Sequence, residues 1–90
     1  MRSQTVMMMP LKTGVDELDA MINEVSDPAE SQCELLREHL ESARNYVLGS
    51  MPREYALTLR LAKQMENCIV NPERRERVKH MIESLLAHEG

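Results

Sequence analysis

The fold of this chain is decided by residues 27–70, which read DPAESQCELLREHLESARNYVLGSMPREYALTLRLAKQMENCIV. The first half carries small and apolar side chains at intervals of four and three residues, which places them along one face of an α-helix. A break at residues 48–52, LGSMP, separates this pattern from a second helical pattern. Because two amphipathic helices joined by a short break pack against each other, the stretch predicts a helical hairpin. The seam of the first helix comprises Ala29, Cys33, Leu36, Leu40, Ala43 and Val47.

Local start and stop signals accompany the first helix. Asp27, Pro28 and Glu30 supply an N-cap acceptor, a first-turn proline and a glutamate placed to bond back to the cap. Gly49 is suited to end the helix because glycine adopts positive φ readily. Pro52 then falls in the first turn of the second helix. These signals agree with the periodicity and fix the expected bounds of the hairpin.

The second arm carries two apolar rows that point in different directions. A helix with two such rows needs two packing neighbours. The first arm is one neighbour, and the other is either the C-terminal helix or the same helix of a second chain. One row comprises Tyr55, Leu59, Ala62, Met65 and Ile69, and the other comprises Leu57, Leu61 and Cys68.

Shorter helical patterns flank the hairpin. An N-cap at Thr13 opens an apolar stripe on one side, and Asn71 and Pro72 open a last helix that runs to about residue 87 on the other. The three glycines and four prolines lie mostly at expected helix ends, which leaves little room for sheet. We predict an all-α fold, a hairpin bundle of about four helices, with a flexible N-terminal arm at 1–12 and one helical domain at 13–90. The methionine-rich arm is either a mobile terminus or a docking segment.

Size and charge narrow the class of partner. A core built by 90 residues is small, and a second subunit often covers its remaining apolar surface. The formal net charge is −4, and neither half of the chain carries the basic excess that neutralises phosphates. We therefore expect a homodimer that also binds an unidentified cytoplasmic protein, and we do not expect nucleic acid as a partner.

The dimer interface is expected on the spare row of the second arm and on the apolar stripe of the first helix. The alternative is that both sets of side chains belong to the core of a single chain. The candidate interface residues are Leu57, Leu61 and Cys68, with Val15, Leu18 and Ile22 as contributors.

A basic cluster in the last helix is a second candidate surface. It would suit an acidic partner, but Glu73 and Glu76 interleave with it, so the alternative is a solvent-exposed helix face with internal charge pairs. The candidate patch comprises Arg74, Arg75, Arg77 and Lys79.

The sequence contains no recognisable catalytic or metal-binding constellation. The three histidines and two cysteines lack metal-ligand spacing, and there is no glycine-rich phosphate loop or nucleophile motif. We therefore expect a protein that is not an enzyme, with no cofactor, no metal and no small-molecule substrate.

The two cysteines lie on opposite arms of the hairpin. The apolar run Val6-Met7-Met8-Met9 is too short for a signal peptide, and no stretch reaches transmembrane length. These features predict a cytoplasmic protein without a membrane partner. In that setting Cys33 and Cys68 would stay reduced and act as small hydrophobic side chains, with a disulfide as the less favoured alternative.

The hairpin resembles the AriR/YmgB family of small enterobacterial biofilm and acid-resistance regulators. The resemblance covers about residues 32–87 and rests on Gly49 at a helix end, the Met65-Glu66 pair, the break at residues 69–72 and the closing Leu85-Leu86. Met65 stands where the family would have leucine, and Pro52 lies in a region that the family fills with polar residues. The resemblance implies a dimeric helical regulator that acts through protein contacts, with a two-component signalling protein as the partner and DNA as an alternative.

A second resemblance involves the four residues 52–55, PREY, which look like the Pro-x-x-Tyr turn of type III secretion needle co-chaperones. It implies a hairpin that presents apolar faces to a partner chaperone. A phage-encoded inhibitor of the anti-CRISPR type is a further alternative, because such proteins are also small and acidic. The sequence as a whole favours a small non-enzymatic regulator or adaptor that binds a signalling or transcription factor as a dimer.

Overall fold

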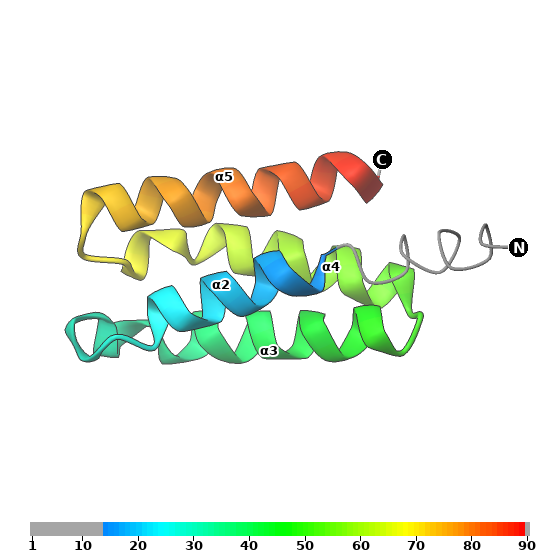
Figure 1. The fold of residues 1–90 in the computed structure, drawn as a ribbon, viewed down its shortest axis with the longest axis horizontal. Coiled ribbons are helices and arrows are strands. Elements are labelled where there is room, and N and C mark those ends of the chain that lie inside the picture. The colour runs from blue at the N-terminus through cyan, green and yellow to red at the C-terminus, as the bar shows by residue number, and fades with distance from the viewer. Residues whose placement is uncertain (1–13, 90) are drawn as a thin grey trace, which may run out of the picture.

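The computed structural model describes residues 14–89, with the side chains of residues 14–87. Four α-helices run in alternating directions: α2 (Val15–Val25), α3 (Glu34–Leu48), α4 (Pro52–Gln64) and α5 (Pro72–Glu89) (Figure 1). Two short 3-10 helices, η2 (Pro28–Cys33) and η3 (Glu66–Cys68), lie in the connections. Residues 14–89 contain no strand, and the predicted all-α fold of about four helices is confirmed.

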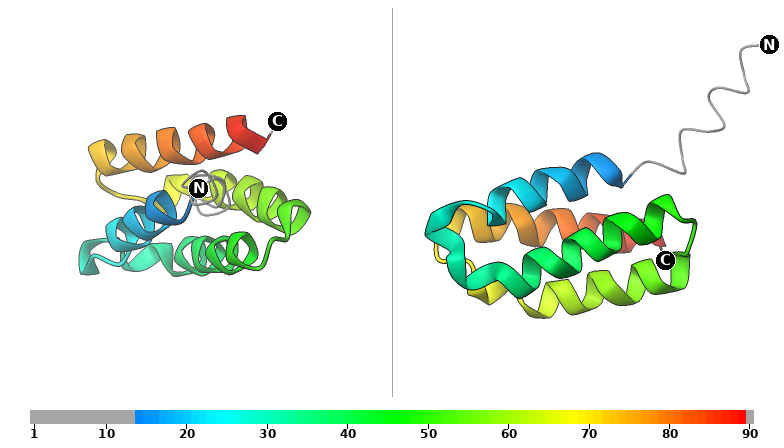
Figure 2. Two further views of the ribbon diagram at one scale, coloured as in Figure 1. Left: turned by 45° about the vertical axis from the view of Figure 1, so that its right-hand side comes forward. Right: turned by 90° about the horizontal axis from the view of Figure 1, so that it is seen from below.

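Each helix packs against two neighbours. Helices α2 and α4 both contact α3 and α5, so the four helices form an antiparallel bundle (Figures 1 and 2). The apolar stripes that face the bundle axis are removed from water, and this burial is the main stabilising term. The buried apolar core comprises Leu18, Met21, Val25, Cys33, Leu36, Leu40, Ala43, Tyr55, Leu59, Ala62, Ile69, Val78, Ile82 and Leu85.

The turn between α3 and α4 is a Schellman motif displaced by one residue from the prediction. Gly49 has a φ of −89°, whereas Ser50 has a φ of 57°. The N–H of Met51 donates to the carbonyl of Tyr46 at 2.9 Å, and the N–H of Ser50 donates to the carbonyl of Val47 at 3.2 Å. These two bonds place the left-handed position at Ser50. The prediction that Gly49 takes positive φ is therefore wrong, because the helix reaches one residue further than expected.

The connection before α3 also departs from the prediction. Asp27 caps as expected, since its carboxylate accepts from the N–H of Ala29 at 2.8 Å. Glu30, however, has a non-helical φ of −110° and ψ of 39°, and the regular helix begins only at Glu34. The carboxylate of Glu30 makes its hydrogen bonds across the bundle end and not within a capping box, as described below. Thr13 and the arm at 1–12 lie outside the described residues.

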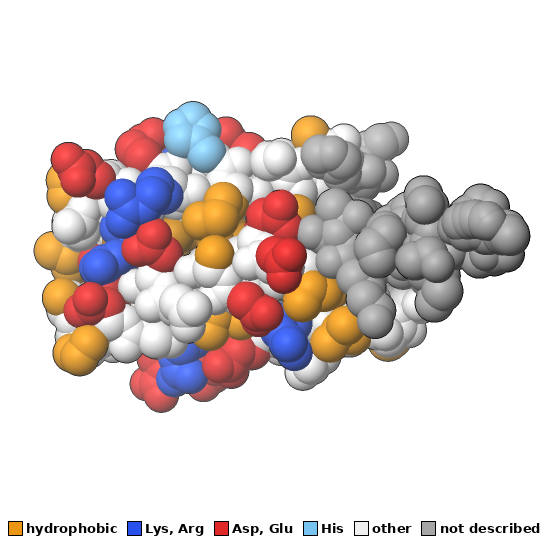
Figure 3. All heavy atoms as spheres, in the orientation of Figure 1, with side chains coloured by type: hydrophobic (Ala, Val, Ile, Leu, Met, Phe, Trp, Pro, Cys, Tyr) orange, Lys and Arg blue, Asp and Glu red, His pale blue; other side chains and the backbone are white. Residues whose placement is uncertain are grey.

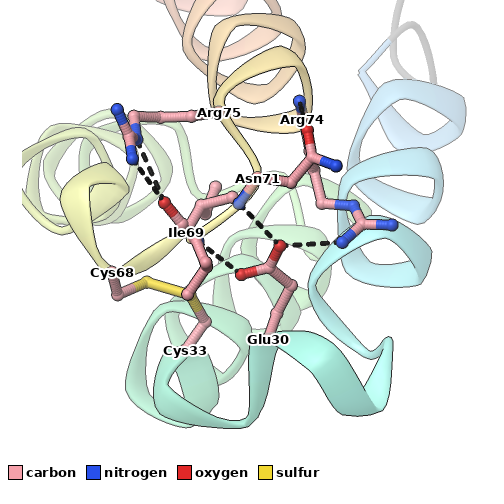
Figure 4. Close-up of a disulfide and its surroundings, with 8 residues drawn as sticks. Glu30, Cys33, Cys68, Ile69, Asn71, Arg74 and Arg75 are labelled. Carbon is pink, nitrogen blue, oxygen red and sulfur yellow. Dashed lines mark hydrogen bonds and ion pairs between the residues drawn. A yellow bond between two sulfur atoms is a disulfide. The ribbon is translucent and has the colours of Figure 1, made fainter.

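Cys33 and Cys68 form a disulfide between the last residues of η2 and η3, with their Cα atoms 5.4 Å apart (Figure 4). The prediction of two reduced thiols is wrong in this structure. Each cysteine lies 17 residues from the pair Ser50-Met51 at the turn. An antiparallel hairpin places residues that are equidistant from its turn at the same level, and the two thiols therefore meet.

Candidate functional site

Three leucines point away from the core on the outer surface of the hairpin formed by α3 and α4, which lie side by side (Figure 2, right). The exposed fractions are 57% for Leu57, 38% for Leu61 and 53% for Leu35. We call this surface the hairpin outer face. Its exposed residues are Glu34, Leu35, Glu38, Glu41 and Asn45 on α3, and Arg53, Glu54, Leu57, Arg60, Leu61 and Gln64 on α4.

Charge is graded across the hairpin outer face. On α3, Glu41 lies toward α2, because it is three residues before Arg44, which pairs with Asp19 of α2 at 2.7 Å. On α4, Arg60 lies toward α5, because it is three residues before Lys63, which pairs with Glu83 of α5 at 3.5 Å. Residues three or seven apart share a helix side, so Glu34 lies with Glu41, and Arg53 lies with Arg60. The face therefore has an acidic edge, where Arg37 also pairs with Glu34 and Glu41, a centre that holds the leucines and Glu54, and a basic edge.

An open groove adjoins the basic edge. It has a volume of about 750 Å³ and lies between α4 and the end of α5. Apolar and cationic side chains share its wall, and Leu57 belongs both to the groove and to the hairpin outer face. The lining residues are Pro52, Arg53, Glu54, Ala56, Leu57, Arg60 and Leu86.

The remaining interface candidates occupy other places. Leu18 is completely buried in the core, Ile22 packs against that core, and Val15 is partly buried. All three belong to α2, which is not an immediate neighbour of α4 in the bundle. Cys68 is partly buried and bonded to Cys33. The structure thus brings Leu57 and Leu61 together on one surface and separates them from the α2 residues.

Three of the four basic-patch residues make contacts within the chain. The carbonyl of Ile69 accepts two hydrogen bonds from the Arg75 guanidinium, at 2.9 and 3.0 Å. Arg77 pairs with Glu24 at 2.8 Å, and Arg74 pairs with the same carboxylate at 2.9 Å. Acidic and basic side chains consequently interleave on the face that carries α2 and α5 (Figure 3). This arrangement is the one expected of a face with internal charge pairs, while Lys79 is partly buried.

Glu30 lies at the centre of a buried polar cluster, which we call the Glu30 latch (Figure 4). Its side chain is 0% exposed. The carboxylate accepts from the N–H of Val70 at 2.7 Å, from the N–H of Asn71 at 3.2 Å and from Arg74 at 2.7 Å. Arg74 also reaches Asp27 at 3.3 Å. The latch therefore joins the connection before α3 to the start of α5, beside the disulfide.

No family model, curated protein or solved structure matches this chain. Within residues 14–87, no three side chains of His, Cys, Asp and Glu are grouped so that they could hold a metal ion. None of the described helices combines the length and the apolar character needed to cross a membrane.

Glu30 and its neighbour Glu24 are held in their charged form. Burial would raise the pKa of Glu30, but the hydrogen bonds from Val70, Arg74 and Asn71 outweigh it and lower the pKa below its ordinary value. The hydrogen bond from Arg77 is the main cause of a lowered pKa at Glu24, with Arg74 assisting against the effect of burial. Asp27 also faces Arg74, so the two arginines pair with three neighbouring carboxylates.

Acid is expected to destabilise the bundle through this cluster. Because the folded pKa values of Glu24 and Glu30 lie below the unfolded value, their stabilisation is complete above the unfolded pKa of about 4.3. It is lost as the pH falls below that value and through the folded pKa. Urea unfolding at a series of pH values from 7 to 2 measures this loss. Glu30→Gln should show a shallower decline below pH 4, and an identical decline in both proteins would contradict the assignment.

The sequence reasoning missed two features of these sites. Glu30 was assigned to a local capping box, and no local pattern could reveal partners that lie 40 and more residues away. Leu35 was overlooked because it adjoins Leu36, which belongs to the predicted seam. The sequence does indicate that Leu35 lies outside the seam, because two consecutive residues of a helix point in different directions and Leu36 occupies the seam.

Proposed function

We propose that this protein is a small non-enzymatic regulator or adaptor that acts by binding other proteins as a helical dimer. The observation that carries the proposal is the exposure of Leu57 and Leu61 on α4, a helix whose opposite side already fills the core. Apolar surface that is rimmed by charged residues is typical of protein interfaces. The hairpin outer face has this composition.

The resemblance to AriR/YmgB regulators supports a signalling or transcription factor as the partner. That resemblance rests on the residue pattern alone and is part of the proposal. A cytoplasmic location also stays a prediction, and the Cys33–Cys68 disulfide counts against it, because disulfides are rare in reducing compartments.

A type III secretion co-chaperone is the second candidate function. The groove beside Leu57 favours it, because an open groove on the second arm with both apolar and charged side chains in its wall suits an amphipathic helix of a partner chaperone. The two functions differ in the state of the isolated chain. A self-contained regulator is expected to be a soluble dimer when expressed alone, whereas a co-chaperone would aggregate or stay unstable until its partner is co-expressed.

Leu57→Glu is expected to convert the dimer into a folded monomer. A buried carboxylate without a partner opposes association, whereas an exposed one changes the free energy of unfolding by only about 0.5 kcal/mol. Light scattering after size-exclusion chromatography should show the mass falling to that of one chain, 10.4 kDa. The helical circular dichroism signal should stay unchanged.

Val70→Lys is the matched control for this substitution. Val70 is 61% exposed, and it lies in the connection between η3 and α5, outside the hairpin outer face. This variant should keep the mass of the wild-type protein. A Leu57→Glu chain that is unfolded, or one that keeps the dimer mass, would count against the interface.

A further inference from the structure

We propose that the hairpin outer face binds the same face of a second copy, with a two-fold axis parallel to the helices. This inference rests on the proposed function, because it specifies the geometry of the dimer. The occupant is a second copy because the face is self-complementary in charge. The pairing of Arg60 of one copy with Glu41 of the other defines the geometry.

The position of the charged edges selects the symmetry axis. A two-fold rotation about an axis parallel to the helices places α3 of one copy over α4 of the other. The acidic edge of each copy then faces the basic edge of its partner. A rotation about an axis across the helices would place α3 on α3 and bring the two acidic edges together. Like charges in close contact oppose association, so the parallel axis is favoured.

The register of the hairpin brings specific charges to the same level. The disulfide joins two residues that are equidistant from the pair Ser50-Met51. By the same rule Glu41, nine residues before Ser50, lies level with Arg60, nine residues after Met51. A rotation about a parallel axis does not change this level. Arg60 of each copy therefore faces Glu41 of the other, which gives two equivalent charge pairs per dimer.

The charged groups are available for this contact. Within residues 14–87 neither Arg53 nor Arg60 takes part in an ion pair, and both are exposed. Glu41 binds Arg37 through one oxygen at 3.2 Å, and its side chain is still 47% exposed. A carboxylate has enough lone pairs to accept from two guanidinium groups.

Apolar contacts fill the centre of the same arrangement. Leu61 lies two residues before Lys63, which faces α5, so Leu61 points away from α5 and toward α3. Leu35 lies nine residues before Arg44, which faces α2, so Leu35 points away from α2 and toward α4. Both leucines therefore lie near the proposed axis, where each contacts the same leucine of the second copy, while Leu57 lies against α3 of the second copy. This gives the central apolar contacts and the charged rim that protein interfaces share.

The test is complementation between two charge-reversed variants. Arg60→Glu and Glu41→Lys each place like charges opposite each other twice per dimer, so each variant alone should dimerise about tenfold or more weakly than wild type. Mixing the two variants creates a heterodimer in which both pairs are again of opposite sign. Analytical ultracentrifugation should find the mixture close to wild-type affinity. Since mixing does not change contacts within a chain, such a rescue reports the intermolecular pair.

The outcomes separate this geometry from the proposed function. Glu76→Lys reverses an exposed carboxylate on α5, away from the face, and should dimerise like wild type. A wild-type dimer that is insensitive to Arg60→Glu, or variants that fail to rescue each other, would overturn the geometry and leave the dimer intact. A wild-type protein that is monomeric would overturn the proposed function itself.

Discussion

Reduction of the Cys33–Cys68 disulfide is expected to lower the free energy of unfolding by roughly 4 kcal/mol. The bond closes a loop with a sequence separation of 35, and its loss restores the freedom of that loop in the unfolded chain. A domain of this length has a total stability on the order of 5–13 kcal/mol, so the loss is a large fraction. Urea unfolding of the oxidised protein with and without a phosphine reductant measures it.

The double variant Cys33→Ala, Cys68→Ala is the control for the reductant. It should unfold at the reduced protein's midpoint, apart from the small packing change at the buried Cys33, and should not respond to reductant. Alkylation of the unfolded, unreduced wild-type protein should modify no cysteine. Modified cysteines, or equal midpoints with and without reductant, would contradict the covalent link.

Glu30→Gln is expected to lower the free energy of unfolding by about 3 kcal/mol, because it breaks a buried charge pair while one partner stays in place. The glutamine amide also turns one acceptor into a donor, which faces either a backbone N–H or Arg74. Chemical unfolding at pH 7 measures the change. Glu76→Gln is the matched control, because its side chain is 58% exposed and its contact with His80 spans 3.6 Å. The control substitution should lower the free energy of unfolding by less than about 0.5 kcal/mol.

The two effects are also expected to be coupled. The disulfide and the Glu30 latch join the same two connections at the same end of the bundle (Figure 4). After either link is broken, this end of the bundle is less constrained, so the remaining link stabilises it by a different amount. The free energy of unfolding lost on reduction of Glu30→Gln should therefore differ from the sum of the two separate losses by more than about 0.5 kcal/mol. Strictly additive losses, or a Glu30→Gln variant as stable as Glu76→Gln, would contradict the latch.

The helices were predictable because each carries its own signals. Periodic apolar residues, the cap at Asp27 and the proline at Pro52 are local properties. Helix α4 begins at Pro52 as expected, whereas Asp27 caps η2 and the regular helix α3 begins at Glu34. The second apolar row of this arm left two alternatives for Leu57 and Leu61, the core of one chain or an interface, and both are exposed in the structure. The sequence could not decide between these alternatives, because the choice depends on how the other helices pack around the hairpin.

The bundle end was not predictable from local patterns. Glu30 fits a capping box in the sequence, but three donors, the N–H groups of Val70 and Asn71 and the Arg74 guanidinium, stabilise its carboxylate more than one cap hydrogen bond would. The disulfide depends on the register between the two arms. Cys33 and Cys68 are equidistant from the turn, and this symmetry indicates that the two thiols meet. Reduced thiols were favoured over a disulfide only because the protein was expected to be cytoplasmic.

The most direct test of the dimer proposal is the mass of the wild-type protein by light scattering across a hundredfold range of concentration. We expect a mass approaching twice 10.4 kDa, because the protein should be a stable dimer that dissociates only at the lowest concentrations. A mass of 10.4 kDa at every concentration would contradict it, and the exposed leucines of α4 would then belong to the interface with a different protein.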